Sequence, residues 1–271
     1  MRGNLRTWEE AVIWLRSQPG QRHTVQDCFY DDPISEAAQR YYHSTEWQAV
    51  RPFLPVPAGR ALDLGAGRGI SSYALAREGW QVTALEPDPS TIVGAGAIRM
   101  LAHESGLPVE VVETRGEALP FPAGSFDLVH ARAVLHHAHD LRAFCHEAER
   151  VLKDNGLFLA LREHVISRQS DLKRFQQNHP LHNLYGGEYA FKLTEYLKSM
   201  EQAGLVVEKV LNPFESDINL FPRGREELKR ILGLKVIPPV LVPDRLLHIL
   251  GVLYRKPGRL YSFVARKAEY E

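Results

Sequence analysis

The feature that most constrains this chain is a glycine-rich turn, Gly65-Ala66-Gly67-Arg68-Gly69, directly after the buried-strand pattern at 60–64 (RALDL). Glycines at a strand-to-helix turn permit positive φ and let a ligand approach the main chain. A helical pattern at 70–77 follows at once. The turn therefore predicts a parallel α/β sheet with a ligand site at the carboxyl ends of its strands.

Short apolar runs alternate with helical patterns through the middle of the chain, which is typical of parallel strands joined by crossover helices. Further strands are predicted at 81–86, 109–114, 126–131, 156–162, 205–211 and 260–265, and helices at 90–104, 141–152 and 194–203. Together with 60–64 these strands make an α/β, doubly wound, mostly parallel seven-stranded sheet with helical cap segments.

The same pattern divides the chain into parts. We expect an N-terminal helical cap at 1–57, a core at 58–211 with a helical substrate segment at 164–193, a helical basic insertion at 212–258, and a final strand and tail at 259–271. The segments outside the sheet are where we expect substrate specificity to be built.

Composition excludes several other classes of protein. The 271 residues carry 33 Lys and Arg against 33 Asp and Glu and are 44% apolar, which argues against disorder or a coiled coil. Two distant cysteines, Cys28 and Cys145, argue against a disulfide framework and favour a reducing cytoplasm. Charged residues within 1–18 favour an amphipathic helix over a secretion signal. Prolines and charges interrupt the apolar stretch at 237–254, which excludes a continuous membrane span there.

The zero net charge hides an asymmetry. Residues 223–267 carry 11 basic and 3 acidic side chains, net +8, whereas residues 1–222 carry 22 and 28, net −6. Such a segment suits an anionic substrate, a membrane surface or an acidic patch of the same protein. Its leucines and isoleucines, spaced between the charges, favour short amphipathic helices that form a lid over a small molecule, with peripheral membrane contact through 223–267 as a further option.

The residues around the glycine turn narrow the ligand. A dinucleotide site needs a third glycine at position 70, where this chain has Ile70, so an NAD(P)-dependent oxidoreductase is the weaker alternative. Glu86 ends the second predicted strand about twenty residues beyond the glycines, where a carboxylate accepts hydrogen bonds from ribose hydroxyls.

Two further motifs follow in order, at 116–129 (GEALPFPAGSFDLV) and at 134–137 (VLHH) with 147–156 (EAERVLKDNG). With these, residues from about 60 to 162 resemble the class I S-adenosylmethionine-dependent methyltransferases, in the small-molecule type 11 group that includes quinone-biosynthesis enzymes. The resemblance implies a Rossmann-like fold, S-adenosylmethionine as cofactor, a small-molecule methyl acceptor and in-line methyl transfer.

The resemblance also implies positions for the cofactor. It places Asp63, Gly65, Ala66 and Gly67 along the methionine part, Glu86 at the ribose, Pro87 against adenine, Gly116 and Glu117 at the adenine edge, and Ala131 and Arg132 beneath the sulfonium. Two positions depart from the family. Arg115 stands where a short acidic or amide residue is common, and Asp154-Asn155-Gly156 replaces the usual turn.

Methyl transfer from a sulfonium needs a base only when the acceptor must lose a proton. The candidates near the strand ends are His136, His137, Glu163 and His164. A histidine base contributes roughly 10²- to 10⁴-fold. For the two adjacent histidines, packing and hydrogen bonding are equally open interpretations. For Glu163 and His164, a position in a solvated loop is an equally open interpretation. No metal is predicted, because the histidines between 130 and 146 lack a recognisable ligand set.

Other interpretations remain open at this point. Tyr30, Tyr41 and Tyr42 with Arg40 either close over the cofactor or pack the cap on the core. The end of the fourth strand lacks the Asn-Pro-Pro-aromatic element of DNA adenine methyltransferases, which argues against a nucleic-acid substrate. A catalytically silent S-adenosylmethionine-binding or regulatory module is the principal alternative to an enzyme. The sequence specifies neither the acceptor atom nor an oligomeric state.

Overall fold

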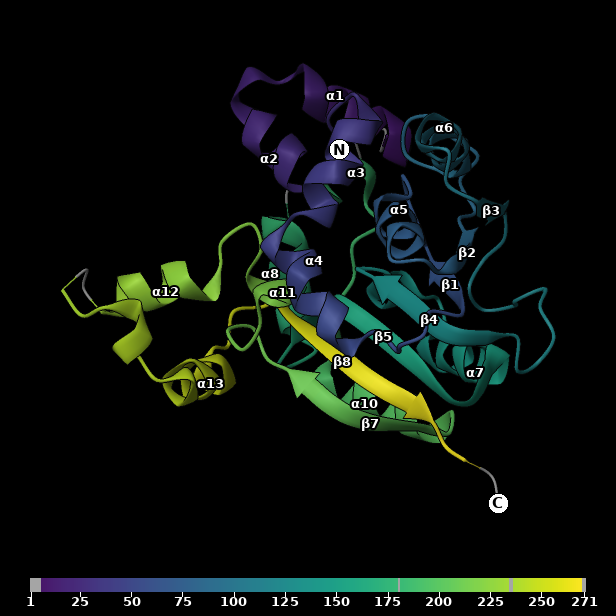
Figure 1. The fold of residues 1–271 in the computed structure, drawn as a ribbon. Helices are drawn as coiled ribbons and strands as arrows, with labels where there is room; N and C mark the ends of the chain where they lie inside the picture. The colour runs from purple at the N-terminus through teal and green to yellow at the C-terminus, as the bar shows by residue number, and fades with distance from the viewer. Residues whose placement is uncertain (1–5, 180, 234–235, 270–271) are drawn as a thin grey trace.

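The structure is a computed structural model that describes residues 6–179, 181–233 and 236–269. A twisted sheet runs through the middle of the molecule, and helices cover both of its faces (Figure 1). The main strand order is β3-β2-β1-β4-β5-β8-β7, with the two-residue β6 paired to β5 outside this path. The expected seven-stranded, doubly wound sheet is thus confirmed, with one short strand added.

The first five strands run parallel, and β8 pairs antiparallel with both β5 and β7. The strands are β1 Arg60–Leu64, β2 Gln81–Leu85, β3 Val109–Val112, β4 Phe126–Arg132, β5 Leu152–Ile166, β6 Phe191–Lys192, β7 Leu205–Leu211 and β8 Arg259–Lys267. β5 is longer at both ends than its apolar pattern predicts. β8 pairs with it across a bulge, so that Glu163 lies opposite Tyr261 and His164 opposite Leu260. Glu163 and His164 therefore belong to the strand and not to the segment after it.

Each face of the sheet has its own layer of helices. The α-helices are α1 Trp8–Ser17, α2 Arg22–Asp27, α3 Ile34–Tyr42, α4 Thr45–Val50, α5 Ile70–Arg77, α6 Ala95–Ser105, α7 Leu141–Val151, α8 Asp171–Asn178, α9 His182–Tyr185, α10 Leu193–Gln202, α11 Asp217–Leu220, α12 Arg225–Leu232 and α13 Asp244–Leu253. Short 3-10 turns lie at Pro19–Gln21 (η1), Arg51–Phe53 (η2), Leu135–His137 (η3) and Pro239–Leu241 (η4). One apolar cluster joins the sheet to α7 and α10, and the other joins it to α3, α4, α5 and α6.

The helix ends follow local chemistry. α1 begins with a capping box, in which Thr7 accepts from the Glu10 amide and Glu10 accepts from the Thr7 amide. Its inner face buries Ala11, Val12 and Leu15, which confirms an amphipathic helix near the N-terminus. α6 begins at Ala95, five residues later than expected, because Ser90 accepts from the Ile92 and Val93 amides in a turn before the helix.

The last part of the basic segment, Arg259–Lys267, is β8 of the sheet, and the helices before it form an arm that stands away from the sheet. α12 and α13 project to one side of the molecule (Figure 1). Several of its large apolar side chains are exposed, among them Val240, Leu241, Ile249, Val252 and Leu253. Within the described residues, every helix is too short or too polar to cross a membrane.

Candidate active site

A cavity of about 640 Å³ opens at the carboxyl ends of the parallel strands. The loop between β1 and α5 lines one end, together with residues that follow β2. A group of histidines lines the other end, and aromatic side chains from the N-terminal helices close it. The size is that of a small-molecule site.

The β1–α5 loop needs its glycines. Gly65 and Gly67 have φ values of +61° and +54°, and Gly69 caps α5 with φ +82°. A Cβ on Gly65 would lie 2.7 Å from the side chain of Val134. Because L side chains rarely adopt this backbone, only glycine leaves the loop open toward the cavity. Gly65, Ala66 and Gly67, for which cofactor contacts are predicted, all line the cavity.

Glu86 lies directly after β2, half-buried beside the cavity. Its Oε2 accepts from the Gly67 amide at 2.8 Å, and its Oε1 accepts from the Asp88 amide at 3.0 Å. Burial raises the pKa of Glu86 to about 7, although these two hydrogen bonds oppose the change. Each carboxylate oxygen keeps a second lone pair that a ribose hydroxyl can use. Pro87 lines the cavity next to it.

Asp63 has a structural role that the sequence did not predict. It is 1% exposed, and its Oδ2 accepts from the Ser72 hydroxyl at 2.6 Å. Its Oδ1 lies 2.8 Å from Nδ1 of His130. Asp63 lines the cavity, but its carboxylate ties β1 to α5 and β4.

The predicted adenine edge also lines the cavity. Gly116 packs against the ring of Phe144, which leaves no space for a side chain there. Glu117 accepts from the His139 amide at 3.0 Å, and this hydrogen bond fixes the two loops that frame the site. Arg115, Gly116 and Glu117 are all lining residues.

Two residues at the end of β4 are predicted to lie beneath the sulfonium, but only one of them lines the cavity. Ala131 is fully buried in the core and does not line the cavity, because its side chain points into the cluster packed on α7. Arg132 does line it. The Arg132 Nε and Nη2 atoms donate to Glu46 at 2.5 and 2.9 Å. Burial lowers the pKa of Arg132, but Glu46 outweighs this effect and the pKa is raised overall.

A second arginine completes this buried cluster. Arg162 sits in the β5 bulge with φ +60°, and its Nη1 lies 3.6 Å from Glu46. Glu46 is fully buried, so the three charges hold α4 against the carboxyl ends of β4 and β5. Sequence reasoning missed Glu46 and Arg162. No local motif could have revealed Glu46, because its partners are far along the chain.

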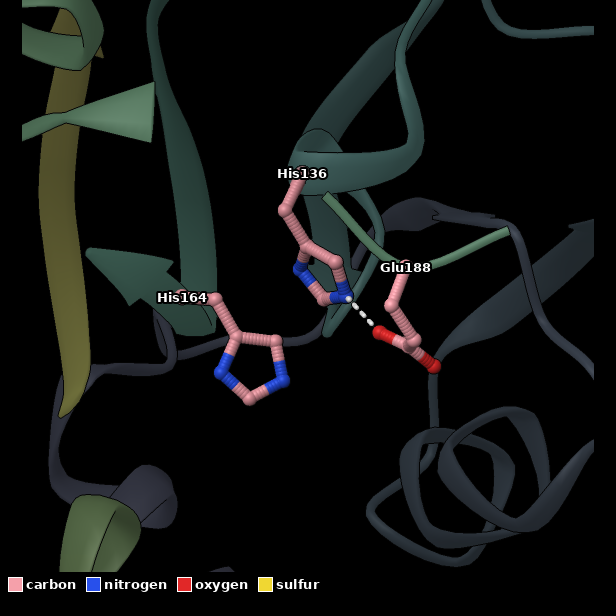
Figure 2. A group of neighbouring side chains, drawn as sticks. All are labelled: His136, His164 and Glu188. Carbon is pink, nitrogen blue, oxygen red and sulfur yellow. Dashed lines mark ion pairs between the residues drawn. The ribbon is translucent and has the colours of Figure 1, made fainter. Parts of the chain in front are cut away.

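Histidines dominate the other end of the cavity. His137 is exposed into it, with Nδ1 3.1 Å from the Gly187 carbonyl oxygen. His136 is buried and His164 half-buried, and both line the cavity. Burial lowers the pKa of each well below its ordinary value, and a neighbouring histidine adds to the effect. Figure 2 shows both rings beside Glu188, from the loop after α9, which the sequence analysis did not single out.

Glu163 does not reach the cavity, contrary to our expectation. Its side chain is fully buried and accepts from the Val134, Leu135 and His136 amides at 3.1, 3.1 and 3.0 Å. Its Oε2 also lies 2.7 Å from Nδ1 of His136. Burial raises the pKa of Glu163 to about 7, against the effect of these amides. The bulge in β5 turns Glu163 beneath the η3 loop, so it positions His136.

Aromatic residues of α1 and of the loop after α2 contact the segment after β5. Trp8 packs on Tyr185 with ring centroids 4.7 Å apart and on Tyr30 at 5.4 Å. Trp8 and Tyr30 line the cavity, whereas Tyr41 lies fully buried in the core. Tyr42 and Arg40 are not lining residues, so among these tyrosines only Tyr30 is placed to close over a ligand.

The strand order, the glycine loop and the acidic residue after β2 are those of a class I methyltransferase fold. A family model described as a methyltransferase domain matches residues 62–160. Residues 62–160 therefore form a methyltransferase domain, and the fold of the chain is that of the class I S-adenosylmethionine-dependent methyltransferases.

Similar curated proteins include ubiquinone biosynthesis O-methyltransferases. That of Methylobacterium nodulans is 40% identical over 107 residues, which cover 40% of this chain and 42% of the relative. The protein of the same name from Methylobacterium sp. strain 4-46 is 33% identical over 162 residues, 58% of this chain and 64% of that protein. The matches thus span about half the length of these relatives.

Solved structures share the fold over a longer stretch. A geranyl diphosphate methyltransferase in complex with S-adenosylmethionine has a TM-score of 0.61 at 16% identity, covering 97% of both chains. The YcgJ protein of Bacillus subtilis has a TM-score of 0.55 at 20% identity, covering 83% of this chain and 99% of that one.

Proposed function

We propose that this protein transfers the methyl group of S-adenosylmethionine to a hydroxyl group of a small aromatic molecule. The observation that supports this most is one continuous cavity with two chemically different ends. The glycine loop and Glu86 form an end suited to an adenosyl group. The histidines, with Trp8, Tyr30 and Tyr185, form an end suited to a planar acceptor.

The residues at the first end fit the cofactor. Gly65 and Gly67 expose the main chain, and Glu86 offers free lone pairs to two vicinal hydroxyls. When bound, the cofactor supplies an electrophilic methyl group: its carbon–sulfur bond breaks as the bond to the acceptor forms, and sulfur keeps the electron pair. The chain contributes mainly alignment, which can be worth about 7–11 kcal/mol.

At the second end, His137 is the residue we propose to hold the acceptor. Its Nδ1 faces a carbonyl oxygen, which can only accept, so Nδ1 carries the proton. Nε2 is free to accept a hydrogen bond from the acceptor hydroxyl and to take its proton as the methyl group is transferred. His136 and His164 form the adjoining wall. Glu163 acts through His136 and is a positioning residue. The names of the O-methyltransferase relatives support oxygen as the methylated atom.

Purified protein tests both binding and turnover. We expect S-adenosylhomocysteine to bind in calorimetry, and labelled methyl groups to transfer to a catechol or hydroxyquinol but not to aliphatic amines. His137→Ala should lower turnover and leave the S-adenosylhomocysteine affinity unchanged. Binding without transfer to any member of a broad acceptor panel would instead support a catalytically silent binding module.

We also infer that the arm formed by α12 and α13 rests on anionic lipid surfaces. Its exposed Ile249, Val252 and Leu253 lie between residues 223 and 258, which carry 8 basic and 3 acidic side chains, net +5. Apolar side chains among basic ones are the pattern of an interfacial helix, and the apolar and ionic contributions add.

Vesicle sedimentation tests the arm. We expect binding to vesicles that contain phosphatidylglycerol, weaker at high salt, and little binding to phosphatidylcholine alone. The double variant Ile249→Asp/Leu253→Asp should no longer bind the phosphatidylglycerol vesicles. The matched control is Val56→Asp, which changes a residue 93% exposed elsewhere on the surface. Equal binding by all three proteins would contradict this role of the arm.

We place the protein in the cytoplasm because Cys28 and Cys145 are both free thiols. Fractionation of cells that express it should recover it from the cytosol and, through the arm, from the inner face of the membrane. Recovery from an oxidising compartment would contradict this placement.

A further inference from the structure

Three side chains with metal-binding groups converge at the acceptor end of the cavity. His136 lies in η3 after β4, His164 lies in β5, and Glu188 comes from the loop after α9. One ligand atom of each lies within 4.8 Å of the other two, and Figure 2 shows the rings and the carboxylate facing a common space. The Nε2 atom of His136 is 3.7 Å from Oε2 of Glu188.

Both histidines are held in the way that metal ligands usually are. Nδ1 of His136 lies 2.7 Å from the carboxylate of Glu163, and Nδ1 of His164 lies 3.0 Å from the carbonyl oxygen of Gly258. Because both partners are acceptors, each Nδ1 carries a proton and each Nε2 keeps a free lone pair. A carboxylate or carbonyl behind the imidazole fixes the tautomer and orients the ring toward a metal.

Glu188 provides an independent observation. It is 5% exposed, and Tyr185 donates its hydroxyl proton to Oε1 at 2.7 Å. Its Oε2 is buried without a hydrogen-bond partner among the described residues. A buried acceptor left unpaired is costly, so an atom outside the chain is needed to satisfy it. This oxygen is the one nearest to Nε2 of His136.

We propose that His136, His164 and Glu188 bind a divalent transition metal ion of the zinc class. Two imidazoles and one carboxylate are a known catalytic zinc set, which leaves a further position open. Magnesium and calcium favour all-oxygen ligands and fit this set poorly. Bonds of about 2.0–2.2 Å place tetrahedral ligand atoms about 3.4 Å apart, so the trio would close by about an ångström around the ion.

The structure offers a fourth donor close by. Nδ1 of His179 is buried without a hydrogen-bond partner in the described part of the chain and lies 3.9 Å from Oε1 of Glu188. All four side chains line the cavity, so an open position on the ion would face the acceptor. That an acceptor hydroxyl binds there rests on the proposed function, whereas metal binding itself does not.

The test is metal uptake by untagged full-length protein after removal of metals with a chelator. The protein is dialysed against Zn²⁺ or Co²⁺ and the bound metal is measured by mass spectrometry. We expect one ion per chain, and visible Co²⁺ absorption typical of nitrogen ligands. The isosteric variant Glu188→Gln should weaken binding by more than the roughly 10- to 100-fold that loss of a ligand's hydrogen-bond partner costs, and His164→Ala should weaken it at least as much.

Matched controls separate this site from surface histidines and from the cofactor site. Glu117→Gln makes the same change elsewhere in the cavity, and His146→Ala removes an exposed histidine of α7. Both should bind the metal as the wild type does. S-adenosylhomocysteine affinity, measured in parallel, should be the same in wild type and Glu188→Gln. That readout tests the cofactor site independently of the metal.

Two outcomes would overturn the metal site. One is chelator-treated protein that takes up no stoichiometric ion. The other is uptake that Glu188→Gln and His164→Ala leave unchanged while both variants remain folded by circular dichroism. In either case His136 and Glu188 would be packed neighbours that share no metal ion.

Discussion

Two carboxylates that border the cofactor end differ in what surrounds them. Asp63 is enclosed, with both oxygens bonded to Ser72 and His130, whereas Glu86 is half-buried and bonded only to backbone amides. The first is committed to the fold, and the second keeps lone pairs for a ligand. Asp63 and Glu86 both lie near the glycine loop but have different roles, and substitutions can separate these two roles.

The pKa of Glu86, raised to about 7 by burial, makes cofactor binding depend on pH. The ionised carboxylate is the better acceptor for two hydroxyls, so the Kd for S-adenosylhomocysteine at pH 6 should be about tenfold higher than at pH 8. Calorimetry across this range checks it. Glu86→Gln should bind weakly with little pH dependence, and a flat wild-type profile would contradict the ribose role.

The raised pKa of Glu86 also makes the stability of the unliganded protein depend on pH. This stability changes with pH in the opposite direction to the cofactor affinity. Between pH 4.5 and about 7 the native state holds a proton on Glu86 that the unfolded chain has released. This contribution to the free energy of unfolding therefore decreases as pH rises through that window. Urea titrations of wild type and Glu86→Gln should converge at low pH, and should diverge toward pH 8 with the variant more stable.

Asp63→Ala should reduce stability as well as cofactor affinity. The substitution leaves the Ser72 hydroxyl and Nδ1 of His130 without their partner in a buried place. Each such loss costs about 1–3 kcal/mol. Urea denaturation should show the lower free energy of unfolding, and Glu86→Ala is the control because its partners are half-exposed amides. Equal stability of the two variants at pH 8 would contradict the distinction drawn here.

At the scale of elements, the bulged β5 determines the shape of the acceptor end. The bulge between Ala160 and Glu163 turns Arg162 toward the cavity and Glu163 beneath the η3 loop. One carboxylate thereby holds three successive amides, from Val134 to His136. Glu163 contacts both the amide and the Nδ1 atom of His136, and so fixes the position of this histidine.

Glu163→Gln should loosen the η3 loop but leave the packing of the apolar core unchanged. The amide nitrogen cannot accept hydrogen bonds, so one or more of the loop donors loses its partner, at about 1–3 kcal/mol. We expect a lower midpoint in urea and faster hydrogen exchange at residues 134–136, with exchange in α10 unchanged. Unaltered protection of those three amides would contradict the assigned contact.

At the scale of the molecule, buried charges join the N-terminal helices to the sheet. Glu46 of α4 lies between Arg132 of β4 and Arg162 of β5. Burial raises the pKa of Glu46, but the two guanidinium groups outweigh it and the pKa is lowered overall. The stability from this cluster is therefore present above the unfolded value of 4.5 and is lost as pH falls through the folded pKa.

Glu46→Gln should destabilise the whole protein, because it leaves two half-buried arginines without a countercharge. Removing one member of such a cluster costs about 3–5 kcal/mol. Thermal unfolding measures the effect, and Glu36→Gln on α3 is a surface control. If both variants unfold at the wild-type temperature, the cluster does not hold the cap to the sheet.

Much of this architecture is encoded locally. The glycine turn needs positive φ, and the apolar runs fit buried parallel strands. The parallel sheet, and the place of the glycine loop at the carboxyl ends of its strands, could therefore be predicted from the sequence. Those features depend on backbone sterics and on periodicity, which act over a few residues.

Only the tertiary structure decided the acceptor end. β5 is extended by its antiparallel pairing with β8, and Glu163 in this strand is buried away from the cavity. Ala131 likewise faces the core. Glu46 met its arginines, and Glu188 met two histidines, across long separations in the chain. Such contacts depend on how separate elements pack, and a side chain's partner across space leaves no trace in its sequence neighbours. The glycine turn at one end of the cavity is thus determined by consecutive residues, whereas the histidine wall at the other end exists only once the chain has folded.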